Sequence, residues 1–121
     1  MANHNDFGKE AEEKAVGFLK EKNYTILKRN WRFQKAEVDI IAKDESKNEI
    51  VIVEVKARIN PMVEIETAIT KKKKNLLVMA ADEFVSSNQI ELETRFDLIL
   101  IEKNNSNWEI EHIEDAFFAF E

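Results

Sequence analysis

The first part of the chain carries hydrophobic residues at the spacing of one helix face. Five apolar positions follow one another at intervals of four, four, three and one residue, which suits a helix of about 3.6 residues per turn. They are Phe7, Ala11, Ala15, Phe18 and Leu19. Asn5 or Asp6 is suited to cap the first turn, and Asn23 is expected to end the helix. The pattern predicts a helix that runs to about Lys22 and packs this stripe on a core.

Three strands are predicted after this helix, because β-branched and aromatic residues dominate the next segments. The first strand covers Tyr24–Phe33, the second Val38–Ala42 and the third Ile50–Lys56. The polar residues 44–49 lie between the second and third strands and are typical of a turn. These two strands are therefore expected to form a hairpin.

A second amphipathic helix is predicted over residues 63–86, after a loop that Pro61 closes. Its apolar positions are Ile65, Ala68, Ile69, Leu76, Leu77, Ala80 and Phe84. Two strands, Arg95–Ile101 and Trp108–Ile113, follow, with a turn at 104–107 between them. A hairpin followed by a helical crossover implies a mixed sheet with helices on its faces, so the order αβββαββ predicts an α/β fold.

Composition supports one globular domain over residues 1–121. Hydrophobic residues make up 44% of the chain and charged residues 35%, with two glycines and one proline. The chain has no cysteine, which excludes disulfides, thiolate zinc sites and a cysteine nucleophile. The N-terminal residues lack the basic and apolar regions of a signal peptide, and no run approaches the roughly 18 apolar residues of a membrane span. We expect no membrane partner and a cytoplasmic location.

The net charge of −6 argues against a uniformly basic nucleic-acid-binding surface, because phosphate affinity comes largely from cationic side chains. It does not exclude a local basic track. Lys28, Arg29 and Arg32 lie in one segment, and Lys71–Lys74 form another.

Candidate chemistry comes from the predicted hairpin. Residues two apart in a strand share a face, so Glu54 and Lys56 project together from an otherwise apolar strand. If the hairpin closes about Ser46 and Lys47, opposite residues have numbers that add to 93, which places Asp39 across from Glu54. By the same register, Glu37 lies across from Lys56. A slip of one residue would separate this group.

Two facing carboxylates repel each other unless a cation lies between them, and an all-oxygen site suits Mg²⁺ or Mn²⁺. Such a cation can stabilise charge on a phosphodiester and lower the pKa of an attacking water. Lys56 would position that water or help to deprotonate it. The alternative is a surface hairpin in which Glu54 and Lys56 are a solvated charge pair and Asp39 ends a strand.

Several further motifs extend over nearly the whole chain. They are Gly8-x-x-Ala11-Glu12-x-x-Ala15, Tyr24-x-Ile26-Leu27-x-Arg29-Asn30-Trp31-Arg32, Ala36-Glu37-Val38-Asp39-Ile40-Ile41-Ala42, Val53-Glu54-Val55-Lys56-x-Arg58, Thr70-x-x-Lys73, Arg95-Phe96-Asp97 and Ile110-Glu111-His112-Ile113 with Ala116-Phe117. With these motifs the sequence resembles the YraN-like family of small bacterial proteins, which are similar to archaeal Holliday-junction resolvases.

The resemblance implies a restriction-endonuclease-like αβββαβ core, with Asp39 and Glu54 as metal ligands and Lys56 as the catalytic lysine. It also brings Glu12 of the first helix into the site, as a catalytic residue and metal ligand. From the residues alone, Glu12 would be a solvent-facing helix acid. The family usually has glycine where this chain has Ala11 and Ala36, and a positive φ or a close substrate approach at Ala36 would disfavour alanine.

A basic track would extend the site toward nucleic acid. Lys71–Lys74 cover a full helical turn, so a solvated face is the alternative interpretation. Lys73 and Thr70 lie three residues apart on one face and are candidates to contact a phosphate near the metal. Arg29, Arg32 and Arg58 would extend this track or pair with surface acids.

Other polar and aromatic residues are interpreted as structural. A lone His112 in an alternating strand is more typical of a structural residue than of a general base. Asp97, in an apolar strand, is expected to be a buried hydrogen-bonding residue. Trp31 and Trp108 are assigned to packing rather than to base stacking.

Together these features predict a Mg²⁺- or Mn²⁺-dependent DNA endonuclease. Selectivity for branched DNA and a homodimeric state follow only from analogy with resolvases. The first alternative is a non-catalytic nucleic-acid-binding or adaptor protein on the same fold, which the net charge and Ala36 favour. The second is a purely structural protein that binds neither metal nor DNA.

Overall fold

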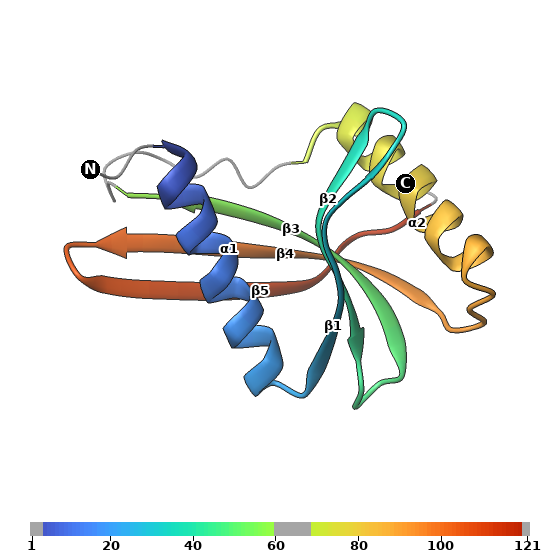
Figure 1. Ribbon diagram of the computed structural model, residues 1–121, viewed down its shortest axis with the longest axis horizontal. Coiled ribbons are helices and arrows are strands. Elements are labelled where there is room, and N and C mark those ends of the chain that lie inside the picture. Colours follow the sequence, from blue (N-terminus) through green and yellow to red (C-terminus); the bar gives the residue numbers. More distant parts are fainter. Residues whose placement is uncertain (1–3, 60–68, 120–121) are drawn as a thin grey trace.

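A computed structural model describes residues 4–59 and 69–119 as two helices and five strands (Figure 1). The elements are α1 (His4–Glu21), β1 (Tyr24–Phe33), β2 (Ala36–Asp44), β3 (Glu49–Arg58), α2 (Lys71–Ser87), β4 (Thr94–Asn104) and β5 (Asn107–Phe117). This is the predicted order of helices and strands.

The five strands form one mixed sheet in the order β1-β2-β3-β4-β5. β3 and β4 are parallel and are joined through α2, whereas the other neighbouring strands are antiparallel. α1 and α2 cover opposite faces of the sheet (Figure 1). The predicted mixed sheet with helices on its faces is therefore confirmed.

Each helix packs an apolar face against one side of the sheet. On the α1 side, Ala11, Ala15 and Leu19 are buried against residues such as Ile40 and Val53. On the α2 side, the buried helix residues Leu77, Ala80, Ala81 and Phe84 contact the second cluster of core residues, which includes Ala36, Val38, Ile41, Ile50, Ile52, Phe96 and Phe117. Each Å² of apolar surface removed from water stabilises the fold by about 25 cal/mol, and burial on both faces of the sheet holds the three layers together.

The start of both helices differs from the prediction. α1 begins at His4, so Asn5 and Asp6 lie inside the helix and neither precedes it as a cap. α2 begins at Lys71, because Thr70 has extended backbone angles and its side chain accepts a hydrogen bond from the Lys73 N–H. The predicted start of this helix at residue 63, the loop proline Pro61 and the apolar positions Ile65 and Ala68 lie outside the described residues.

The predicted register of the β2–β3 hairpin is confirmed where the two strands pair. Ile40 lies opposite Val53 and Ala42 opposite Val51, so the residue numbers add to 93. The pairing ends at Ile40 and Val53. Asp39–Glu54 and Glu37–Lys56 are therefore not ladder pairs, although the register had placed them opposite each other.

Beyond this point the two strands separate. Residues 36–38 of β2 stay paired with β1 and turn toward α2, while residues 54–58 of β3 stay paired with β4 (Figure 1). We call this opening the β2–β3 fork. It interrupts the sheet between the two carboxylates that the sequence singled out.

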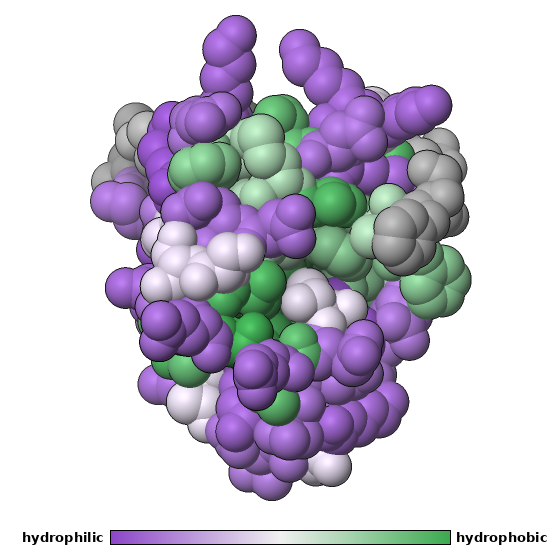
Figure 2. Space-filling view, turned by 90° about the vertical axis from the view of Figure 1, so that its right-hand side faces the viewer, coloured by the Kyte–Doolittle hydropathy of each residue, from purple (hydrophilic) through white to green (hydrophobic). Residues whose placement is uncertain are grey.

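On the face shown in Figure 2, hydrophilic side chains surround a band of hydrophobic ones near the middle. No helix in the described ranges is long and apolar enough to cross a membrane.

Candidate functional site

Asp39 occupies the base of the β2–β3 fork. Its Oδ2 accepts a hydrogen bond from the backbone N–H of Val55 at 2.8 Å. A side-chain oxygen thus binds the β3 amide just beyond the last β2–β3 pair, and this contact fixes the Asp39 carboxylate against β3.

Glu54 and Lys73 approach the fork from β3 and α2. The Nζ atom of Lys73 lies 3.7 Å from Oε2 of Glu54 and donates a hydrogen bond to the backbone oxygen of Glu37 at 3.3 Å. The Glu54 side chain is 15% exposed. Lys56, half-buried two residues farther along β3, lies close enough for its charge to act on Glu54.

The carboxyl groups of Asp39 and Glu54, here called the carboxylate pair, shift each other's proton affinity. Burial and the negative charge of Asp39 raise the pKa of Glu54 to about 7, against the opposing effect of Lys73. Burial also raises the pKa of Asp39, although the Val55 N–H and Lys73 act to lower it. The pair therefore retains a proton in a pH range where isolated carboxylic acids are ionised.

A cavity of about 690 Å³ opens beside Asp39, between the first turns of α1 and the sheet. It is lined by Phe7, Gly8, Lys9, Ala11, Glu12, Asn30, Asp39, Val55 and Ala57. Oε1 of Glu12 accepts hydrogen bonds from Nε of Arg29 at 3.1 Å and Nδ2 of Asn30 at 3.0 Å. With its side chain only 13% exposed, Glu12 is not the solvent-facing acid that the residues alone suggested.

The donor chemistry of the carboxylate pair suits a divalent cation. Mg²⁺ is commonly held by one or two carboxylates and completes its shell with water and phosphate oxygens. The half-buried carboxyl groups of Asp39 and Glu54 would supply these two ligands. The described residues contain no group of three acid or histidine side chains arranged to hold a metal, so in this arrangement of side chains Glu12 is not grouped with Asp39 and Glu54 as a third ligand.

Comparisons with known proteins place these residues in a family. A family model described as "Uncharacterised protein family UPF0102" matches residues 11–101, which include Glu12, Asp39, Glu54, Lys56 and Lys73. This chain belongs to the UPF0102 family. The resemblance to YraN-like proteins is thereby confirmed.

Individual UPF0102 proteins match the chain along almost its whole length. A UPF0102 protein of Flavobacterium psychrophilum is 49% identical over 121 residues, covering 99% of this chain and 100% of the relative. One of Christiangramia forsetii is 46% identical with the same coverage. One of Bacteroides thetaiotaomicron is 44% identical over 119 residues, covering 98% of this chain and 97% of the relative.

The basic residues predicted to contact nucleic acid all have partners within the UPF0102 chain. Arg29 pairs with Glu12 and Glu13, Arg32 with Glu37 and Arg58 with Glu102. Lys73 reaches Glu54, and Thr70 caps α2. Pairing with acids, the alternative considered for the three arginines, is what the structure shows.

Ala36 does not have the backbone conformation that would require glycine. It is the first residue of β2 and is absent from the described non-glycine residues with positive φ. Its side chain is fully buried in the α2-side core, so its Cβ does not obstruct the cavity next to Asp39. The expectation that a positive φ makes alanine unfavourable at this position is therefore wrong.

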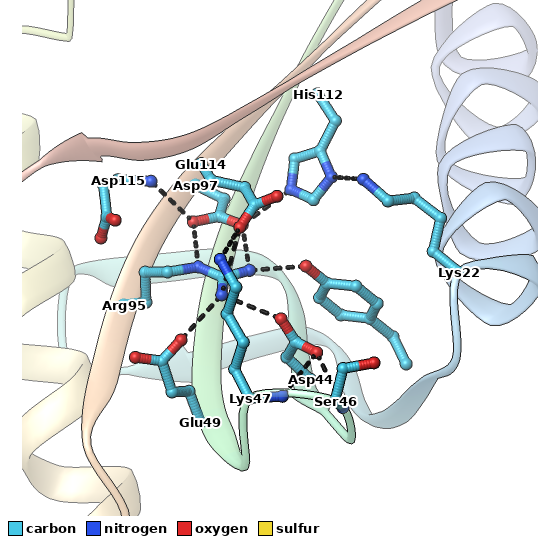
Figure 3. Close-up of polar contacts among 11 residues, drawn as sticks. Lys22, Asp44, Ser46, Lys47, Glu49, Arg95, Asp97, His112, Glu114 and Asp115 are labelled. Atoms are coloured by element: carbon cyan, nitrogen blue, oxygen red, sulfur yellow. Dashed lines mark hydrogen bonds and ion pairs between the residues drawn. The ribbon is translucent and has the colours of Figure 1, made fainter.

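A second polar group, the Arg95 cluster, lies at the opposite end of β2 and β3 (Figure 3). The guanidinium of Arg95, only 3% exposed, donates hydrogen bonds to both carboxylate oxygens of Asp97 at 2.9 and 2.8 Å. It also donates to Asp44 at 2.9 Å, Glu49 at 2.8 Å and the hydroxyl of Tyr24. The cluster connects the ends of β1, β2, β3 and β4.

His112 completes the Arg95 cluster from β5. Its Nε2 lies 2.7 Å from Oδ2 of Asp97, and its Nδ1 lies 2.8 Å from Nζ of Lys22 (Figure 3). An ammonium group can only donate, so Nδ1 is the acceptor and Nε2 carries the proton that binds Asp97. The buried, hydrogen-bonding role predicted for Asp97 and the structural role predicted for His112 are confirmed.

Sequence reasoning identified Asp97 but missed Arg95 as the centre of this cluster. The available signal was the spacing of two between Arg95 and Asp97, which places both on one face of an apolar strand, as for Glu54 and Lys56.

The packing role predicted for the two tryptophans is also what the structure shows. Trp31 and Trp108 are partly buried against the α2-side and α1-side cores, and Trp108 stacks on Phe7 at 5.9 Å.

Proposed function

We propose that this UPF0102 protein is a Mg²⁺- or Mn²⁺-dependent nuclease that hydrolyses phosphodiester bonds in DNA, with branched or structured DNA as its substrate class. The observation that carries the proposal is the carboxylate pair at the β2–β3 fork, with Lys56 and Lys73 beside it. The element order and the mixed sheet support a restriction-endonuclease-like core.

In this mechanism Asp39 and Glu54 would hold the cation, and the Val55 N–H keeps the Asp39 carboxylate in place. When bound, the cation supplies charge stabilisation for the phosphate and a lower pKa for the attacking water. Lys56, on the same strand as Glu54, orients that water or the scissile phosphate. Glu12 is proposed to join the site through the cavity that it shares with Asp39.

Contacts to the DNA backbone are assigned to Thr70, Lys73 and three arginines: Arg29, Arg32 and Arg58. Arg32 pairs with the exposed carboxylate of Glu37 and Arg29 with that of Glu13, and such exposed pairs contribute only about 0–1 kcal/mol. A phosphate, which binds arginine through two parallel hydrogen bonds, can therefore replace these two carboxylates at small cost. Arg58 pairs with the more buried Glu102, so the same exchange costs more there.

Cleavage of linear, flapped and four-way DNA in Mg²⁺ or Mn²⁺ tests the proposal. We expect Asp39→Asn, which retains an oxygen for the Val55 N–H, and Lys56→Ala each to lower the cleavage rate by at least roughly a hundredfold. Asp82→Asn, on the exposed surface of α2, is the matched control and should cut normally. Cutting by Asp39→Asn at the wild-type rate, or cutting without a divalent cation, would contradict the mechanism.

A non-catalytic nucleic-acid-binding or adaptor protein is the second candidate. The internal pairing of Arg29, Arg32 and Arg58 and the lack of a three-residue ligand group among the described residues favour it. DNA binding by the wild type and by Asp39→Asn, with no cutting by either, would identify this function.

A further inference from the structure

Lys73 is fixed at the β2–β3 fork by contacts that do not depend on Glu54. The Thr70 hydroxyl accepts a hydrogen bond from the Lys73 backbone N–H at 3.1 Å, which sets the first turn of α2. The Lys73 ammonium donates to the backbone oxygen of Glu37, a neutral group on β2, at 3.3 Å. Its distance of 3.7 Å from Glu54 is an ion-pair separation longer than a hydrogen bond. The ammonium is thus held beside the carboxylate mainly by α2 and β2.

The neighbouring lysines of the same helical turn lie elsewhere. Lys71 and Lys72 are exposed, and the Nζ atom of Lys74 lies over the ring of Phe117 at 5.6 Å. Lys73 is the member of this run whose ammonium lies 3.7 Å from Glu54, and its charge acts on both Glu54 and Asp39. This specific placement separates Lys73 from a solvated basic face.

We propose that Lys73 is the built-in counter-ion of the carboxylate pair and competes with a divalent cation for Glu54. The inference rests on the proposed function, because it assigns the pair to a cation. One ammonium stabilises the two carboxyl groups while no metal is bound. A divalent cation between Asp39 and Glu54 carries twice the charge and repels the ammonium, so binding has to overcome that repulsion. Lys73 then keeps its contact with Glu37 or turns outward toward a phosphate.

Titration of Mn²⁺, followed by the electron paramagnetic resonance signal of the free ion, measures this competition without any DNA. We expect Lys73→Met to bind Mn²⁺ at least roughly tenfold more tightly than the wild type, since a positive charge beside Glu54 opposes a divalent ion bound there even in water. Lys72→Met removes the same charge from the same turn but from an exposed position, so its affinity should change by less than roughly threefold. Lys73→Arg keeps the charge and should bind no more tightly than the wild type.

Lys73→Gln, which retains a donor for the Glu37 oxygen, replaces Lys73→Met if the latter does not fold. Equal or weaker Mn²⁺ binding by the folded variant, beside measurable binding by the wild type, overturns the role of Lys73 and leaves the proposed nuclease intact. Equal tightening by Lys72→Met also overturns it, because the effect would then be one of net charge. No binding by the wild type or by any Lys73 variant overturns both the counter-ion and the metal site.

Discussion

Asp39 ends the regular pairing of β2 with β3, because its carboxylate rather than a backbone oxygen accepts the Val55 N–H. The sequence allowed the prediction that Asp39, Glu54 and Lys56 converge, since strand periodicity and hairpin symmetry fix which residues approach one another. It did not reveal the fork, because a side chain that replaces a ladder partner leaves no trace in hydrophobic periodicity.

The raised pKa of Glu54 allows the carboxylate pair to be tested by measuring the free energy of unfolding at different pH values. The pKa of Glu54 is raised from 4.5 to about 7 by burial and by Asp39, so the folded protein binds a proton more tightly than the unfolded chain. The stabilisation that the Glu54 proton contributes to the folded state should therefore be lost as pH rises from about 4.5 to 7. Glu54→Gln removes this penalty and should stabilise the cation-free protein at pH 8 by on the order of 1–3 kcal/mol.

Urea unfolding of the wild type and Glu54→Gln at pH 5 and pH 8, in the presence of a chelator, measures the difference. Glu91→Gln, at an exposed position, controls for loss of a negative charge. The difference in the free energy of unfolding between Glu54→Gln and wild type should be larger at pH 8 than at pH 5. An equal difference at both pH values would show that ionisation of Glu54 does not destabilise the folded protein.

At the scale of elements, strands were easier to place than helix starts. The hairpin register followed from the turn, but the start of α2 depended on the extended backbone of Thr70, and several residues are equally suited to cap a helix. The Arg95 cluster was harder still, since it brings together Tyr24, Asp44, Arg95 and His112 from four strands. These residues are far apart in the sequence and meet only because of the order of the strands in the sheet, which the pattern of hydrophobic and polar residues alone does not predict.

Asp97 should be a major source of stability for these strand ends. Burial raises its pKa, but hydrogen bonds from His112 and Arg95 outweigh this effect and hold the pKa below its usual value. Its contribution is thus present above the ordinary pKa of 3.8 and is lost as pH falls through the lowered folded-state value. Asp97→Asn leaves the buried Arg95 without its main counter-charge and should cost about 3–5 kcal/mol.

Chemical denaturation at pH 7 measures that cost, with Asp82→Asn on the exposed face of α2 as the control. A loss for Asp97→Asn no larger than for the control would mean that the remaining acids around Arg95 replace Asp97. DNA cleavage per folded molecule should be unaffected, because the Arg95 cluster lies at the end of β2 and β3 away from the fork.

At the scale of the molecule, two polar groups occupy opposite ends of the same strands, and their electrostatics differ. The Arg95 cluster pairs its buried charges, and no buried side-chain nitrogen or oxygen within the described ranges lacks a partner. The carboxylate pair is instead left with an excess of negative charge that a raised pKa relieves. Two neighbouring carboxyl groups with raised pKa values beside an open cavity are typical of a functional site rather than of a structural one.

Calorimetric titration of Mn²⁺ into the wild type and Asp39→Asn at pH 6.5, in buffers of different ionisation enthalpy, is the decisive test of a metal site at the β2–β3 fork. We expect one binding event in the wild type that releases up to one proton, because the cation displaces the proton held by the carboxylate pair. Asp39→Asn should bind at least roughly a hundredfold more weakly. Absence of binding in the wild type, or equal binding by both proteins, would contradict a metal site at the β2–β3 fork.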